Sequence, residues 1–167
     1  MLSVPKSLRR RAAEVEGWLE LGCPERALDK LTPLLDTPGA RPAALFLRVN
    51  CYTELERFEE ALADLDELRP FDCDPEWFDL KEAWCLKRVD RVSDAARCME
   101  RLLERSRRSA IGHFNLGCYL ALLGEHDRAI DEITRACGLE PEFRAIAADE
   151  PDLESLRGDT RFDELIA

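Results

Sequence analysis

The feature that most constrains the fold of this chain is an internal repeat of 34 residues. Three steps of 34 from Ala27 meet an alanine each time, the last at Ala129, without a gap or an insertion. Seven such columns of four residues hold only apolar or small side chains, and Gly117 is the one residue outside the hydrophobic set. The columns are Val15, Val49, Ala83 and Gly117; Trp18, Tyr52, Leu86 and Leu120; Leu21, Leu55, Val89 and Leu123; Ala27, Ala61, Ala95 and Ala129; Leu28, Leu62, Ala96 and Ile130; Leu31, Leu65, Met99 and Ile133; and Leu34, Leu68, Leu102 and Ala136. A period of this length is typical of stacked repeat units, none of which can bury its apolar face alone.

Each repeat unit predicts two helices. The apolar positions within residues 27–34 are spaced i, i+1, i+4, i+7, and those within residues 15–21 are spaced i, i+3, i+6, so each set forms one helix face. Turn-forming residues such as Gly22 and Gly124 stand between the two helices. The alanine column predicts a close crossing of the two helices, where only a small side chain fits. Pro33 lies inside a predicted helix, which we expect to bend or to end early.

Composition indicates one helical domain and disfavours two classes of partner. Within 167 residues, 46% are hydrophobic, which is ordinary for a globular protein. The formal net charge of −11 argues against nucleic acid and against an anionic membrane surface as partners. No apolar run is long enough to cross a bilayer, and the first residues lack the apolar stretch of a secretory signal.

The residue types that carry catalysis or bind metals form no recognisable pattern. The seven cysteines are scattered without a Cys-x-x-Cys pair, which predicts buried thiols in a reducing cytoplasm and no metal site. His113 and His126 form no metal-binding motif, and no glycine-rich phosphate loop occurs. A partnership of His113 with Cys118 is disfavoured, because a spacing of five residues points the two side chains in different directions. We therefore expect a protein that is not an enzyme and needs no cofactor.

The last repeat carries the motif that identifies the family. The residues that match are Leu116, Gly117, Leu120, Ala129, Ile133, Ala136 and Pro141. In these residues the chain resembles the tetratricopeptide-repeat (TPR) family, whose 34-residue unit follows W-x2-L-G-x2-Y-x8-A-x3-F-x2-A-x4-P. Earlier units depart from this motif: Arg48-Val49 and Glu82-Ala83 replace the Leu-Gly pair, and Gly39, Cys73 and Arg107 replace the closing proline. The resemblance implies an all-α, right-handed α-solenoid of four helix-turn-helix units, of the kind found in bacterial TPR proteins.

The register divides the chain into an N-terminal extension, four units and a C-terminal cap. The predicted ranges are 1–7 for the extension, 8–41, 42–75, 76–109 and 110–143 for the units, and 144–167 for the cap. A stack of repeats ends on an apolar face that must be covered. We expect Leu153, Leu156, Phe162, Leu165 and Ile166 to cover it from two short helices, with Asp152 and Asp159 as N-caps. A docking or dimerisation tail is the alternative role of this segment.

In the TPR family the first helix of each unit lines a concave groove that receives a peptide or a partner helix. Transferred to this chain, the candidate groove residues are Phe46, Asn50, Trp77, Lys81, Trp84, Lys87, Arg88, Ile111 and Phe114, with Cys118 and Ala121 further along the fourth unit. Aromatic groups are frequent anchors of binding hot spots. The resemblance therefore implies a module that binds another protein, through an apolar groove with a basic edge suited to a segment that carries hydrophobic anchors and an acidic group.

Two alternatives stay open at this point. Trp77, Trp84 and Phe114 could pack between helices or under the cap instead of lining a groove. The protein could also be a homo-oligomer, in which the N-terminal helix of one copy docks on the groove of another through Met1, Leu2, Val4 and Leu8.

Overall fold

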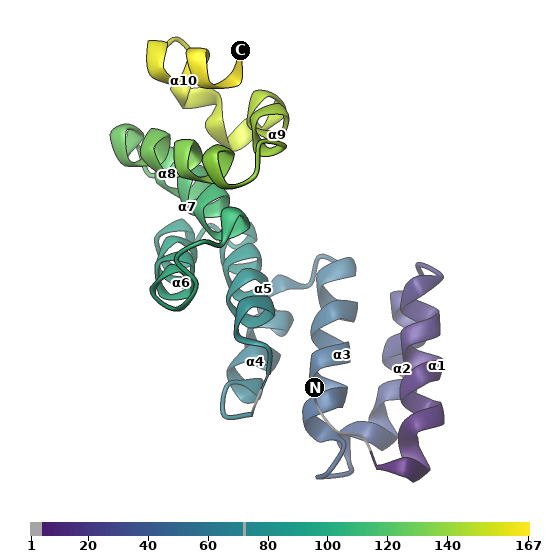
Figure 1. Cartoon of the computed structure of the whole chain (residues 1–167). Coiled ribbons are helices and arrows are strands. Elements are labelled where there is room, and N and C mark those ends of the chain that lie inside the picture. The colour runs from purple at the N-terminus through teal and green to yellow at the C-terminus, as the bar shows by residue number, and fades with distance from the viewer. Residues whose placement is uncertain (1–4, 72) are drawn as a thin grey trace. The chain divides into compact units, whose positions relative to one another are not determined.

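Every regular element in the described part of the chain is a helix. The computed structural model describes residues 5–71 and 73–167, and within them it contains no strand. In chain order the elements are the 3-10 helix η1 (Lys6–Leu8), α1 (Arg9–Glu20), α2 (Pro24–Leu35), α3 (Arg41–Glu54), α4 (Phe58–Leu68), α5 (Pro75–Arg88), α6 (Val92–Arg105), α7 (Ala110–Leu122), α8 (His126–Leu139), α9 (Phe143–Asp149), the 3-10 helix η2 (Pro151–Leu156) and α10 (Thr160–Ile166). Figure 1 shows them coloured along the chain. The all-α fold predicted from the repeat is confirmed.

The chain divides into two compact units, residues 1–78 and residues 79–167. In the first unit α1 packs against α2, α2 against α3, and α3 against α4. In the second unit α6 packs against α7 and α7 against α8, while α9, η2 and α10 follow them. Consecutive helices thus form antiparallel hairpins, the arrangement that the two-helix repeat predicts.

The apolar columns form the cores of the hairpins. The four alanines of the close-crossing column, Ala27, Ala61, Ala95 and Ala129, have no exposed surface. Gly117 lies in α7 at an even closer approach, because a Cβ atom there would stand 2.6 Å from Cδ1 of the buried Ile133 in α8. A larger residue at either position would separate the two helices, so the small side chains set how closely they pack.

One column of the seven does not belong to the core. Leu21 and Leu123 are exposed, at 71% and 38%, although the sequence places them on an apolar helix face. Both are C-cap residues, at which the first helix of the hairpin ends. The next residue in each case, Gly22 or Gly124, has a positive φ that turns the chain into the second helix. The turn therefore carries the end of this helix face out of the core.

Pro33 lies in the last turn of α2, and the helix continues for two residues beyond it to Leu35. The carbonyl oxygen of Pro33 accepts a hydrogen bond from Oγ1 of Thr37 at 3.0 Å. A hydroxyl thus binds a carbonyl near the helix end, where intrahelical partners run out.

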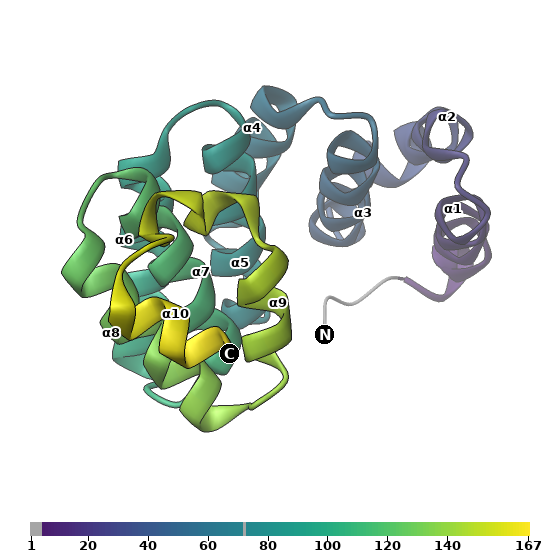
Figure 2. The same cartoon turned by 90° about the horizontal axis from the view of Figure 1, so that it is seen from above.

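The C-terminal segment covers the last hairpin, as expected, but one of its two N-caps is a different residue. η2 packs against α7 and α8, and α10 packs against α8 and α9 (Figure 2). Leu153, Leu156 and Phe162 are buried, and Asp159 caps α10 by accepting a hydrogen bond from the backbone of Arg161 at 3.0 Å. The prediction for Asp152 is wrong: Glu150 caps η2. The side chain of Asp152 is instead held in an ion pair with a lysine of α5, which draws it away from the helix end.

Candidate functional site

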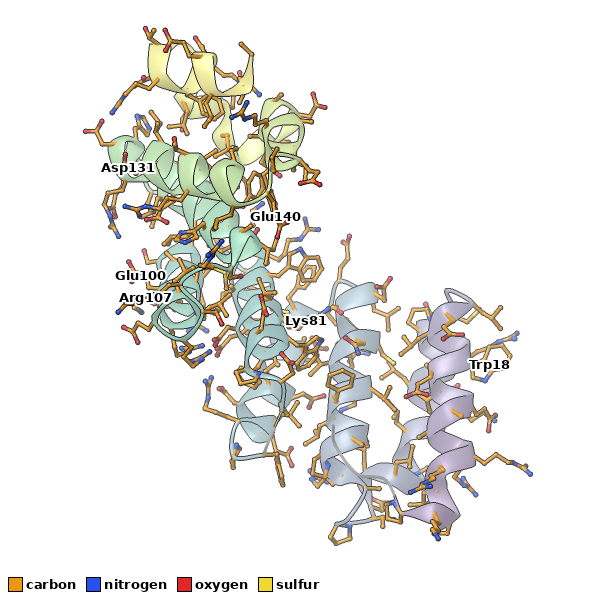
Figure 3. The ribbon with its side chains drawn as sticks, in the orientation of Figure 1. Trp18, Lys81, Glu100, Arg107, Asp131 and Glu140 are labelled. Atoms are coloured by element: carbon orange, nitrogen blue, oxygen red, sulfur yellow. The ribbon has the colours of Figure 1, made fainter. Side chains whose placement is uncertain are left out.

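An exposed tryptophan between two cations marks the surface of α5. Trp84 has 41% of its surface exposed, which is unusual for so large an apolar side chain. Lys81 Nζ lies 5.9 Å from the centroid of its ring, and Arg88 Cζ lies 5.8 Å from it. Both distances lie within the range of a cation–π interaction. The spacing i−3 and i+4 on one helix brings the three side chains together, and Figure 3 shows Lys81 on α5.

Lys87, one turn further along α5, is not part of this open surface. Its ammonium group lies 2.6 Å from a carboxylate oxygen of Asp152 in η2. The side chains are 29% and 15% exposed, so both charges are partly removed from water. Sequence reasoning missed this partner, because 65 residues separate the two and no motif links them.

The first two candidate groove residues of α7 lie in different surroundings. Ile111 is exposed at the start of the helix. Phe114 is only 4% exposed, because its ring packs against Phe143 of α9 with the centroids 4.8 Å apart. Phe114 therefore lies as the alternative interpretation predicts, packed beneath the C-terminal segment.

The remaining candidates belong to the first unit and its end. The rings of Phe46 in α3 and Trp77 stack with centroids 4.2 Å apart, and both side chains are half-buried. The backbone N–H of Trp77 donates to the carboxylate of Asp74 at 2.8 Å, which caps the start of α5. Asn50 is half-buried on α3. Trp77 thus packs at the start of its helix, whereas Trp84 is exposed.

Cys118 and His113, two residue types that often carry chemistry, are both buried. Burial raises the pKa of the Cys118 thiol, and the nearby carboxylates of Glu150 and Asp152 raise it further, so the thiol is neutral at physiological pH. His113 lies between the carboxylate of Glu132, 2.5 Å away, and the carbonyl of Arg107, 3.0 Å away. Among the described residues no group of three side chains is placed to hold a metal ion.

The comparison with protein families places these helices in a known group. Residues 80–150 match the family described as tetratricopeptide repeat. Over these residues the chain belongs to the tetratricopeptide-repeat family. No curated protein matches its sequence.

Solved structures share the TPR fold over nearly the whole chain. The structure titled "MamA 41-end from Desulfovibrio magneticus RS-1" matches with a TM-score of 0.74 and 16% identity, covering 98% of this chain and 97% of that one. The structure titled "MamA RS-1 ArsTM double mutant" matches with a TM-score of 0.76 and 15% identity, covering 98% and 96%. YrrB, described as a TPR protein with an unusual peptide-binding site, matches with a TM-score of 0.72 and 16% identity, covering 96% and 89%. Identities this low show the fold alone.

Self-assembly through the N-terminus stays a prediction. Met1, Leu2 and Val4 lie outside the described residues, and Leu8 packs against the core of the first unit. Among the described helices, none is both long enough and apolar enough to cross a membrane.

Proposed function

We propose that this TPR protein is a non-enzymatic interaction module that binds an acidic segment of another polypeptide around Trp84. The observation that carries the proposal is the exposed ring of Trp84 with Lys81 and Arg88 near it. A rigid aromatic ring supplies contact area at a small entropic cost, and the cations favour carboxylates. The cytoplasm is the compartment we assign to it, because all seven cysteines are free thiols and five of them are buried in the helical core.

The expected ligand follows from the chemistry of this surface. An apolar side chain of the ligand covers the Trp84 ring, and flanking carboxylates lie near the Lys81 ammonium and the Arg88 guanidinium. Ile111, at the start of α7, is another exposed apolar side chain among the candidate groove residues. YrrB binds its peptide on the same fold, which makes this mode of binding compatible with the architecture.

The test is selection of peptides from a random library, followed by affinity measurements on variants. We expect Trp84→Ala to weaken binding of the selected peptides by roughly ten-fold or more, as at a binding hot spot. Arg88→Glu should also weaken the binding of acidic peptides, and the loss of affinity should be larger at low salt than at high salt. Tryptophan emission in a Trp18→Phe, Trp77→Phe variant reports on Trp84 alone during the titration.

Two matched controls separate the site from general surface effects. Leu122→Ala removes another exposed apolar side chain of the same unit, 45% exposed on α7. Arg97→Glu makes the same charge change as Arg88→Glu on α6, at a side chain that is 70% exposed. If the controls weaken binding as much as the Trp84 and Arg88 variants do, the proposed site is wrong.

A further inference from the structure

The C-terminal segment, residues 143–156, contacts residues of α5 and α7, the first helices of the third and fourth repeats. Phe143 covers Phe114, and Asp152 pairs with Lys87. The hydroxyl of Ser155 donates to the backbone carbonyl of Ala121 at 3.4 Å. Figure 2 shows the end of the chain lying across α7 and α8.

These contacts fall on the positions where the family geometry places a ligand. Lys87, Phe114, Cys118 and Ala121 were all derived from the sequence as groove residues of the third and fourth repeats. Three of them contact the C-terminal segment directly, and the charges of Glu150 and Asp152 act on the fourth, Cys118. The segment therefore occupies this part of the groove in the way a bound peptide would.

The chemistry of the contact is that of ligand recognition. One aromatic ring of the segment fills an apolar position: Phe143 is 7% exposed and Phe114 is 4% exposed. One carboxylate of the segment neutralises the lysine at the edge, with 2.6 Å between Lys87 Nζ and Asp152 Oδ2. An apolar cap alone would require only Leu153, Leu156 and Phe162, which are 0%, 1% and 0% exposed.

We propose that residues 143–152 are an intramolecular ligand of the TPR groove, and that an acidic segment with an aromatic anchor from a partner protein competes with them for Lys87 and Phe114. This proposal rests on the proposed function, and it adds both the chemistry of the partner and a self-occupied state that limits binding. The apparent affinity of a partner falls by the fraction of molecules in which the site is open. Weakening the contact of the segment with Lys87 raises that fraction.

The experiment uses the full chain and a labelled synthetic peptide with the sequence of residues 141–158. Binding is followed by fluorescence anisotropy at low salt. Asp152→Lys replaces the ion pair by a repulsion, and we expect this variant to bind the peptide about ten-fold more tightly than the unchanged protein does, in line with one partly buried charge contact. Adding Lys87→Glu restores an opposite-charge pair, and the double variant should regain the thermal stability that Asp152→Lys loses.

Glu154→Lys is the matched control. It makes the same charge change two residues further along η2, at a side chain that is 80% exposed and lies 3.7 Å from Arg157 rather than near Lys87. We expect its affinity for the peptide to equal that of the unchanged protein. Equal binding by Asp152→Lys and Glu154→Lys would overturn the proposal.

Two further measurements distinguish failure of this proposal from a loss of folding and from failure of the proposed function. Thermal unfolding shows whether Asp152→Lys keeps a cooperative fold, and Asp152→Asn, which only removes the charge, replaces it if it does not. The Trp84→Ala measurement on library peptides is independent of the C-terminal segment. If Trp84→Ala abolishes their binding while Asp152 variants change nothing, the interaction module stands and the intramolecular ligand is wrong.

Discussion

The hairpins α3–α4 and α5–α6 each contain a partly buried ion pair between their two helices, but the helix that carries the positive charge differs. In α3–α4 the cation is on the first helix: Arg48 makes two 2.6 Å hydrogen bonds to the carboxylate of Asp64 on the second. In α5–α6 the acids are on the first helix: Arg101 Nη2 of α6 lies 2.6 Å from Asp79 and 2.6 Å from Glu82. Arg48 and Glu82 are 34 residues apart, so they are the same position of the repeat.

The first hairpin continues this alternation, whereas the last holds a histidine–carboxylate contact. In α1–α2 the acid is again on the first helix, with Glu14 3.1 Å from Lys30. In α7–α8 the first helix carries His113, and Glu132 of the second helix lies 2.5 Å from its ring. Lys30, Asp64 and Glu132 occupy one repeat position with changing sign. The columns stay apolar or small from hairpin to hairpin, whereas the charges of the polar contacts change sign between α3–α4 and its neighbours.

The difference teaches how near-identical units can keep the right partners. Repeat proteins risk pairing a helix with the wrong neighbour, because every unit offers the same apolar face. If α6 paired with α3, Arg101 would meet Arg48, and if α4 formed a hairpin with α5, Asp64 would meet Glu82. Like charges at partly buried positions disfavour both errors, so the inversion adds specificity that the apolar columns cannot supply.

The largest expected effect comes from placing like charges inside one hairpin. Asp64→Arg sets two guanidinium groups together at a side chain only 7% exposed, and we expect it to lower the free energy of unfolding by roughly 3 kcal/mol or more. Adding Arg48→Asp restores an attraction and should recover most of the loss. Urea unfolding of the single and double variants measures both.

Asp66→Arg is the control for this pair of variants. Its side chain is 75% exposed and pairs only locally with Arg69, so we expect a change within about 0.5 kcal/mol. If Asp64→Arg is no more harmful than Asp66→Arg, or if the double variant recovers nothing, the contact does not define the hairpin.

A smaller loss is expected when the cation of the third hairpin is removed. Arg101→Met keeps the aliphatic stem but leaves the buried carboxylates of Asp79 and Glu82 without this partner, while Arg105 still pairs with Asp79. We expect a loss of about 2 kcal/mol, less than for charge reversal, because no repulsion is introduced. Arg97→Met on the same helix, at a side chain 70% exposed, should change stability by about 0.5 kcal/mol or less. Equal losses in the two variants would remove the distinction between interior and surface contacts.

In the third hairpin Cys98 stands at the repeat position of Asp64. Its thiol predicts that the free energy of unfolding falls at alkaline pH. Burial and the nearby charge of Glu82 together raise the pKa of Cys98 to about 12. Because the pKa is raised in the folded state, the stabilisation is fully present below pH 9.0 and is lost as pH rises towards 12. The loss should approach about 1.4 kcal/mol per pH unit above 9, and Cys98→Ala should reduce that slope. An unchanged slope in Cys98→Ala, measured by urea unfolding at pH 9 and 10, would contradict this.

The sequence predicted the repeated part of the molecule and not what differs between repeats. The alanine column is buried in every hairpin because its 34-residue period reflects a local crossing of two helices. The ion pair of Lys87 with Asp152 could not be predicted from the period, because it joins the third repeat to a segment outside the repeats. Asp152 comes before Leu153 and Leu156 in the sequence, as an N-cap residue would. Only the structure shows that Glu150 is the N-cap of η2.

For the candidate site, the TPR geometry predicted which residues lie on the first helices of the repeats, but not which of them are exposed. That geometry places Trp84 and Phe114 on first helices, and it cannot distinguish a residue left open from one covered by the chain itself. Trp84 is exposed and Phe114 is covered by Phe143, because the C-terminal segment follows α8 and packs against α7. Exposure therefore depends on the non-repeating end of the molecule.

The smallest expected effect tests a feature in which the two hairpins agree. Their turns place Glu56 and Asp90 at the repeat position of Gly22 and Gly124, with φ values of 55° and 61°. This left-handed conformation favours glycine, and aspartate tolerates it better than glutamate does. Glu56→Gly should therefore stabilise the protein by about 0.5–1 kcal/mol, and Asp90→Gly by less, whereas Gly124→Ala should destabilise it by a similar amount. Thermal unfolding measures the three changes, and a loss of stability in both glycine variants would show that side-chain contacts outweigh backbone strain in these turns.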